Sequence, residues 1–174
     1  MLLVGAEARG KDLVIAAARR RYAGDPRLDF PARLQTRASA HDSEHIGIPR
    51  RVFRDIEANQ GFAVAWQNAG DRHGLTAGAL AALEAGRIVV LAVPPDALES
   101  FISLWPRVEM IAFGSDVDQA RPRTSRLKTS IPPMGAGIRH PGDIAEAVRR
   151  FHGVLDDLTR RQFAPAAEAS LPTR

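Results

Sequence analysis

The stretch that decides the fold is Gly5-Ala6-Glu7-Ala8-Arg9-Gly10-Lys11-Asp12. It follows the phosphate-binding pattern G-x-x-x-x-G-K-[ST] as far as the lysine, and an aspartate then stands where a hydroxyl is usual. The apolar residues 1–4 predict a short strand before the loop, and residues 11–22 predict a helix after it. In such a setting, loop amides and a helix N-terminus converge on a phosphate. The sequence therefore predicts a phosphate-binding loop, and the alternative is a tight strand-to-helix turn made by the two glycines.

Lysine stands at only two positions, Lys11 and Lys128, and the other basic residues are arginines. A compact ammonium group on a flexible stem suits the β- and γ-phosphates of a nucleotide, so Lys11 is the candidate cation of the loop. Asp12 has two interpretations. Its carboxylate is a hard oxygen donor of the kind that binds Mg²⁺, or its negative charge begins the helix at the positive end of the helix dipole.

Composition places the chain among ordinary globular proteins. Its 174 residues are enough for one domain with a substantial core, which we expect over 1–163, with a flexible tail at 164–174. There is no run of about 18 or more apolar residues, so no membrane span is predicted. The absence of cysteine excludes disulfides and thiolate metal sites and fits a cytoplasmic protein. A net charge of +4 suits phosphorylated ligands or nucleic acid.

Strand-like and helix-like stretches alternate along the chain, which predicts an α/β fold with a largely parallel sheet. Strands are predicted near 28–36 and at 62–66, 73–75, 88–93 and 108–113, and helices at 49–59, 76–85, 96–104 and 143–162. Residues 68–71 predict a turn between two of the strands. Glycine, proline, serine and arginine dominate residues 114–137. A segment of that length without periodicity is a functional lid or a disordered loop.

Two further blocks of sequence carry a resemblance to known proteins. They comprise Arg33-Leu34-Gln35-Thr36-Arg37 with Ser43-Glu44-His45-Ile46, and Phe53 with Phe62-Ala63-Val64-Ala65-Trp66 and His73-Gly74-Leu75. Together with the loop, they resemble the guanylate-kinase-like branch of P-loop phosphotransferases, and within it the ribose 1,5-bisphosphate phosphokinases of bacterial phosphonate degradation. The loop of that family also ends in Gly-Lys-Asp. The resemblance covers about residues 1–90 and extends loosely to the C-terminal helix.

This resemblance implies a P-loop NTPase of the guanylate-kinase-like, three-layer type, with a mostly parallel sheet flanked by helices. It implies an enzyme, a phosphotransferase that uses ATP and Mg²⁺ to phosphorylate ribose 1,5-bisphosphate to 5-phosphoribosyl 1-diphosphate. The part that binds the acceptor is then expected at about 28–75 and the lid at about 114–137. The expected partner is a small phosphosugar.

Residue roles follow from the same resemblance. The nucleotide is expected on Gly5, Ala6, Glu7, Ala8, Arg9, Gly10, Lys11 and Asp12, the catalytic residues are Lys11, Asp12 and Arg123, the metal ligand is Asp12, and the acceptor is expected on Arg33, Arg37, Glu44 and Trp66.

The chemistry of the acceptor-side residues is compatible with these roles. Arg33 and Arg37 lie four residues apart on a predicted extended segment, so both side chains are expected on one side. Guanidinium groups bind phosphate in a bidentate manner. Glu44 offers a hydrogen-bond acceptor to sugar hydroxyls, and Trp66 is expected to wall the pocket. The alternatives are surface charges for the two arginines and a core position for the tryptophan.

The chain departs from the family pattern in its loop, its lid and one turn. Glu7 and Arg9 are bulky for such a loop, Pro122 interrupts any helix in the lid, and the apolar stretch Ala92-Val93-Pro94-Pro95 replaces a polar segment. Two alternatives therefore stay open. One is a kinase-derived module that binds a nucleotide or phosphosugar without turnover, and the other is a nucleoside-monophosphate kinase of the guanylate type.

Other partners receive less support from the sequence. The arginine pairs and triplets lie on alanine-rich helices without an aromatic platform, so we expect a solvated face and not a nucleic-acid surface. His41 and His45 lie four apart beside two carboxylates, but their flanks are typical of a loop, which does not favour zinc. We expect no membrane partner, and a homodimer stays open.

Overall fold

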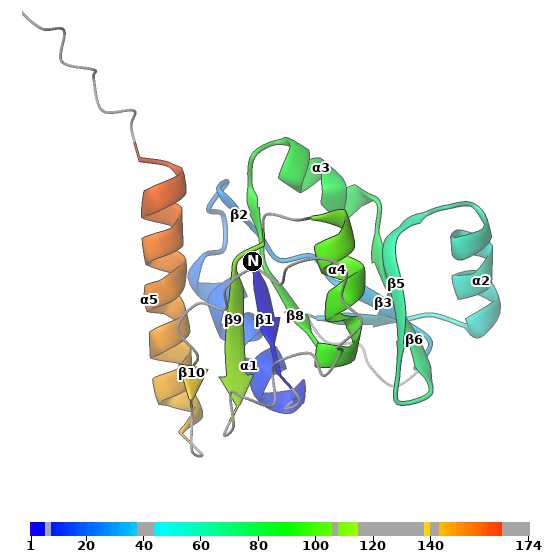
Figure 1. The fold of residues 1–174 in the computed structure, drawn as a ribbon, viewed down its shortest axis with the longest axis horizontal. Coiled ribbons are helices and arrows are strands. Elements are labelled where there is room, and N and C mark those ends of the chain that lie inside the picture. The colour runs from blue at the N-terminus through cyan, green and yellow to red at the C-terminus, as the bar shows by residue number, and fades with distance from the viewer. Residues whose placement is uncertain (6–7, 38–43, 106–107, 115–137, 140–142, 165–174) are drawn as a thin grey trace, which may run out of the picture.

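A parallel four-stranded sheet lies at the centre of the molecule (Figure 1). The computed structural model describes residues 1–5, 8–37, 44–105, 108–114, 138–139 and 143–164. The strand order is β10-β9-β1-β8, and the strands are β1 (Leu2–Val4), β8 (Leu91–Val93), β9 (Met110–Gly114) and β10 (Ile138–Arg139). Every residue of β1, β8 and β9 is buried, as is typical of a parallel sheet that is covered on both faces.

Two long helices cover one face of this sheet. They are α1 (Ala8–Arg21) and α5 (Ile144–Gln162), which pack against each other and bury Ile15 and Phe151 completely. The side chain of Asp143 caps α5 by accepting a hydrogen bond from the third residue of the helix, 3.0 Å away. Such a cap satisfies an N–H group that a helix otherwise leaves without a partner.

Shorter helices cover the opposite face. α4 (Leu98–Leu104) follows the 3₁₀ turn η1 (Pro95–Ala97), and its Phe101 is buried in a core cluster with residues of β1, β8 and β9. α3 (Gly78–Glu84) contributes to the same cluster. Helices on both faces of a mostly parallel sheet make a three-layer α/β fold. The predicted fold class is confirmed.

A second four-stranded sheet carries the part of the chain where the acceptor is expected, and its order is β4-β3-β6-β5. β5 and β6 form an antiparallel hairpin whose turn holds Ala69 at φ 49° and Gly70 at φ 82°. A two-residue hairpin turn needs this left-handed pair, so the turn predicted at 68–71 is confirmed. The elements of this part are β3 (Arg33–Gln35), β4 (His45–Gly47), α2 (Arg50–Ala58), β5 (Phe62–Asn68) and β6 (Asp71–Thr76).

The single strand predicted at 88–93 is wrong, because this run serves two sheets. The N–H of Val90 still donates to Asp29 O (2.8 Å), whereas the N–H of Leu91 donates to Met1 O (3.1 Å). Both halves are apolar and buried, so the pattern alone contains no signal for the change of partner. The two short strands that pair here are β2 (Leu28–Asp29) and β7 (Ile88–Val89).

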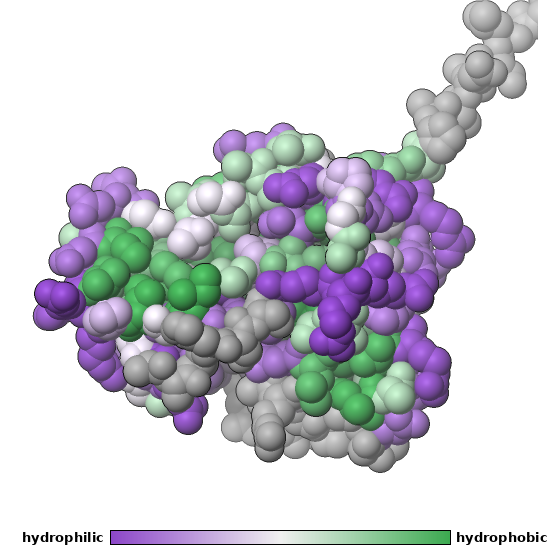
Figure 2. Space-filling model, turned by 180° about the vertical axis from the view of Figure 1, so that it is seen from behind, coloured by the Kyte–Doolittle hydropathy of each residue, from purple (hydrophilic) through white to green (hydrophobic). Residues whose placement is uncertain are grey.

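The surface seen from behind shows separate apolar areas between hydrophilic residues (Figure 2). No helix in the described ranges is both long and apolar enough to cross a membrane. Exposed large apolar side chains include Leu13, Ile46, Leu104 and Phe163. Ile46 belongs to β4, which is an edge strand of the second sheet.

Candidate active site at the ends of the parallel strands

The phosphate-binding loop begins directly after β1, at a position where only glycine fits. A Cβ atom built on Gly5 would overlap the carbonyl oxygen of Phe113 in the neighbouring strand β9. Helix α1 then begins at Ala8, three residues earlier than predicted. The first turn of the helix therefore belongs to the loop, which brings its N-terminal N–H groups to the carboxyl end of the sheet. Ligands of parallel α/β sheets bind at this end.

Lys11 lies in the first turns of α1 and is almost completely buried, with 3% of its surface exposed. Its Nζ donates a hydrogen bond to the carbonyl oxygen of Gly5. The ammonium group is thus held between the strand end and the helix start, which is where the sequence predicts phosphate. A buried ammonium has a large cost of desolvation that an anionic ligand would offset.

Asp12 is connected to the second sheet through Arg33. The Arg33 side chain is buried, with 6% exposed, and its Nη2 lies 3.2 Å from Oδ1 of Asp12. Its Nη1 donates to the carbonyl oxygen of Ala92 at 2.6 Å, and its Nη2 lies 2.8 Å from Nε2 of His45. One guanidinium group therefore joins α1, the parallel strand β8 and the acceptor-side strand β4. We call these three contacts the Arg33 junction.

The apolar stretch at 92–95 contributes to the Arg33 junction through its backbone. Because the group that Arg33 contacts is the carbonyl of Ala92, the loss of polar side chains in this stretch does not remove the interaction.

Trp66 lies in the core, with 8% of its surface exposed. Its ring stacks on His73 at 5.5 Å between centroids and meets Phe101 edge-on at 5.4 Å. The structure therefore places Trp66 among buried aromatic rings, which is the alternative core position, and its contact with an acceptor stays a prediction. The reason is that β5 lies against α4, and inward-facing residues of the strand enter the shared cluster.

His73 is neutral near pH 7. Burial, and next the positive charge of the neighbouring Arg33, lower its pKa from 6.5 to about 4. The centre of the site therefore contains the cation of Arg33 and the carboxylate of Asp12, with an uncharged imidazole beside them.

Glu44 and Arg37 lie in different surroundings. Glu44 is buried, with 4% exposed, and its Oε1 is 3.3 Å from Nη2 of Arg19 on α1. The same Arg19 nitrogen donates to Phe30 O at 2.6 Å. Arg37 lies two residues beyond the end of β3 and is exposed, whereas Arg33 is buried. The two arginines thus do not share one strand, and their predicted contact with an acceptor stays a prediction.

Several predicted site residues lie outside the described residues. They are Ala6, Glu7 and Arg123, together with residues 115–137 of the expected lid and His41 of the zinc alternative. Ala8, Arg9 and Gly10 belong to the first turn of α1. Within the described ranges no group of three or more histidine, aspartate and glutamate side chains is placed to hold a metal ion.

The chain is 31% identical over 180 residues to a protein from Pseudofrankia inefficax named ribose 1,5-bisphosphate phosphokinase PhnN, and the match covers 98% of this chain and 93% of that protein. The chain belongs to the ribose 1,5-bisphosphate phosphokinase family. A protein of the same name from Rhizobium etli is 31% identical over 176 residues, which cover 91% of this chain and 89% of the relative. No family model matches the sequence.

A solved structure supports the fold of this phosphokinase family member. The crystal structure of guanylate kinase from Anaplasma phagocytophilum matches it with a TM-score of 0.63, over 91% of this chain and 85% of that chain. At 12% identity this likeness concerns the fold alone. The resemblance in sequence and the guanylate-kinase-like fold are thus confirmed, and the chain is a phosphotransferase of the kinase type.

Sequence reasoning missed two residues that this phosphokinase family member brings to its site. Arg19 was assigned to a solvated arginine face, yet it reaches back to the buried Glu44. His45 was named in a block that carries the resemblance and was weighed for zinc, but its contact with Arg33 was not expected. The sequence signal for His45 was its place in the same block as Arg33; the parallel strand pairing that sets the two residues side by side is seen only in the structure.

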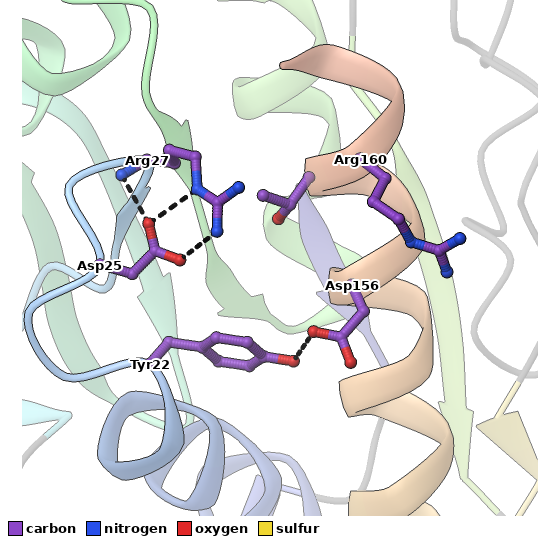
Figure 3. Close-up of a pocket in the computed structure, with 6 residues that line it drawn as sticks. Tyr22, Asp25, Arg27, Asp156 and Arg160 are labelled. Atoms are coloured by element: carbon purple, nitrogen blue, oxygen red, sulfur yellow. Dashed lines mark hydrogen bonds and ion pairs between the residues drawn. The ribbon is translucent and has the colours of Figure 1, made fainter. Parts of the chain in front are cut away.

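A separate cavity of about 340 Å³ lies between the end of α1 and helix α5 (Figure 3). Its charged side chains pair within the protein: Arg27 binds both oxygens of Asp25 at 3.0 and 2.8 Å, and the hydroxyl of Tyr22 donates to Asp156 at 2.7 Å. The Tyr22–Asp156 bond connects the end of α1 to α5, whereas the Arg27–Asp25 pair lies within the turn after α1. Tyr22 and Asp156, which line this cavity, therefore help to hold the two long helices together.

We expect Tyr22 to titrate well above the ordinary range of tyrosine. Burial, and next the hydrogen bond to Asp156, raise its pKa from 10 to about 12. A raised pKa in the folded state means that the stabilisation is complete below pH 10 and is lost as the pH rises toward 12. Tyr22 is the only tyrosine of the chain, so ultraviolet absorbance of tyrosinate measures it directly.

The control for this titration is Tyr22→Phe. It should lower the unfolding free energy by about 1 kcal/mol near pH 7, the usual net value of one hydrogen bond. Between pH 10 and 12, the unfolding free energy of this variant should also fall less than that of the wild type. A tyrosinate midpoint near pH 10 in the folded protein would contradict the burial of the hydroxyl between α1 and α5.

Proposed function

We propose that the chain transfers the γ-phosphoryl group of ATP to the 1-phosphate of ribose 1,5-bisphosphate, giving ADP and 5-phosphoribosyl 1-diphosphate. The observation that supports this most is the Arg33 junction, because it connects the helix of the phosphate-binding loop to the acceptor-side sheet. Phosphoryl transfer depends mainly on the positioning of donor and acceptor and on neutralising charge. The names of the relatives supply the identity of the acceptor.

The residues at the loop fit ATP and Mg²⁺ by their chemistry. Lys11 would bind the phosphates, since its buried ammonium group lies beside the Gly5 carbonyl, between the end of β1 and the start of α1. Asp12 would hold Mg²⁺, since a carboxylate has two oxygens with several lone pairs, and Arg33 contacts Oδ1. The metal, when bound, would neutralise charge that develops on the phosphates. Lys11 and the N–H groups of α1 orient the donor.

On the acceptor side the cations differ in their availability. Arg33 is buried and has three contacts within the protein, so we assign it to holding the sheet in place. Arg37 is exposed and lies just beyond the same strand. We propose Arg37 as the guanidinium group that binds a phosphate of the sugar.

Replacing Arg37 by methionine should raise the acceptor KM about 10-fold or more, since hydrogen bonds to a charged group contribute about 1.5–3 kcal/mol. The KM for ATP should stay the same, because the donor lies on the loop. The melting temperature should also stay the same, since the side chain is exposed. Steady-state kinetics with each substrate varied in turn measures this. An equal rise in the KM for ATP would place Arg37 on the donor side and contradict the assignment.

The experiment that tests the function itself is a coupled ADP-release assay with four acceptors side by side. They are ribose 1,5-bisphosphate, ribose 1-phosphate, ribose 5-phosphate and GMP. Preference for ribose 1,5-bisphosphate supports the proposal and its place in phosphonate degradation. Preference for GMP would favour the nucleoside-monophosphate kinase. ATP binding without ADP release on any acceptor would favour the non-catalytic module.

A further inference from the structure

The contact between Arg33 and His45 determines the protonation of the imidazole. Nη2 of Arg33 lies 2.8 Å from Nε2 of His45. A guanidinium group has only donors, so the ring nitrogen must accept. His45 is therefore in the neutral form whose proton is on Nδ1.

Strand pairing places these two side chains together. Arg33 and His45 are register partners in the parallel pair of β3 and β4. The backbone N–H of Arg33 also donates to Glu44 O at 2.9 Å, which fixes this register next to the contact. The register of the two strands thus brings the imidazole within reach of the Arg33 guanidinium group.

The contact with His45 uses the same Arg33 atom that contacts Asp12. Nη2 of Arg33 on β3 lies 2.8 Å from Nε2 of His45 on β4 and 3.2 Å from Oδ1 of Asp12 on α1. The Nη2 atom of Arg33 therefore has two fixed partners, a carboxylate on α1 and an imidazole on β4. Removing the imidazole leaves Nη2 held from the α1 side only.

We propose that His45 is a positioning residue of the phosphotransfer: by accepting a hydrogen bond from Arg33, it sets the acceptor-side sheet relative to the helix that carries Lys11 and Asp12. This inference rests on the proposed function, since the reaction that it serves is that phosphotransfer. His45 acts through Arg33 and is assigned no contact with a substrate. A misplacement of about 1 Å between reacting groups can lower a rate about 10²-fold, so a side chain with this role affects kcat.

The test compares His45→Leu with His45→Gln in the ADP-release assay. Glutamine can present its amide oxygen near the place of Nε2, whereas leucine has no acceptor. We expect His45→Leu to lower kcat by about 10-fold to 10²-fold with the KM for ATP unchanged, and His45→Gln to restore most of kcat. Ile46→Gln, an exposed change on the same strand, is the matched control and should match the wild type. Equal loss in both His45 variants, or no loss in either, would overturn the proposal.

Two further measurements keep the inference testable without turnover. Nitrogen NMR of the imidazole in the wild-type protein should show a proton on Nδ1 only, and a proton on Nε2 at neutral pH would overturn it. The changes in melting temperature caused by His45→Leu and by Arg33→Met should be non-additive in the double variant. Additive changes would also overturn the proposal. If the wild type releases no ADP with any acceptor, the proposed function fails, and these two readouts still decide whether His45 holds Arg33.

Discussion

Replacing Lys11 by alanine should lower kcat by about 10²–10³-fold, the usual loss when one group that stabilises transition-state charge is removed. The ammonium group is held at the start of α1 beside Gly5, where the γ-phosphate of a bound nucleotide is expected. Kinetics with saturating ATP and acceptor measures the loss. The effect should fall on kcat more than on KM, because the charge that Lys11 neutralises develops during transfer.

Stability provides the control for the Lys11 variant. Alanine removes the hydrogen bond to Gly5 O, at about 1 kcal/mol, but it also removes a buried charge whose desolvation is unfavourable. The melting temperature should therefore change little. Arg20→Ala, an exposed change on the same helix, should leave both kcat and melting unchanged. Unchanged kcat in Lys11→Ala would contradict the loop assignment, and a large loss of stability would favour a purely structural turn.

Replacing Arg33 by methionine should lower both stability and activity. The change leaves Ala92 O without the donor that it has in the structure, and it takes away a cation from Asp12. Because the Asp12 side chain is 30% exposed, we expect about 2–3 kcal/mol of lost unfolding free energy, below the value for a fully buried pair. The ratio kcat/KM should fall about 10²-fold, since the loop helix and the acceptor sheet lose their connection.

The comparison variants for Arg33 separate charge from geometry. Arg33→Lys keeps the charge but cannot reach Ala92 and Asp12 in the fork geometry of a guanidinium group, so it should recover only part of either property. Arg54→Met changes an exposed arginine of α2 and should affect neither. Chemical denaturation and the ADP-release assay measure both effects. An Arg33→Met protein with wild-type stability would show that the Arg33 junction does not hold the two parts together.

Much of the fold was predictable because its signals are local. The turn at 68–71 and the cap at Asp143 depend on residues that lie within four positions of each other. The change of sheet partner inside 88–93 was not predictable, since it depends on which distant strand has unpaired backbone groups. The two-residue strand β10 was also missed, because it is defined by its partner β9 and not by any pattern of its own.

The candidate site was predictable to a similar degree. The motif placed Lys11 and Asp12 at the start of the helix that follows the first strand, and the structure has both in the first turns of α1. Sequence spacing treated Arg33 and Arg37 as equivalent, but burial distinguishes them. Glu44 and Trp66 were expected at the acceptor from the resemblance; the structure pairs Glu44 with Arg19 and packs Trp66 in the core, and their contact with an acceptor stays a prediction. Such partners come from tertiary packing, which single-sequence patterns do not encode.

The overlap between a side chain at position 5 and the carbonyl of Phe113 has an evolutionary consequence. Any mutation of Gly5 would push β1 and β9 apart before it altered a ligand contact, so selection for folding alone should purge it. Gly153 is a contrasting position, because a Cβ there meets nothing within 4 Å. In a population under relaxed selection for catalysis, position 153 should accumulate variants while position 5 stays glycine. We therefore expect position 5 to remain glycine even in relatives that have lost the activity.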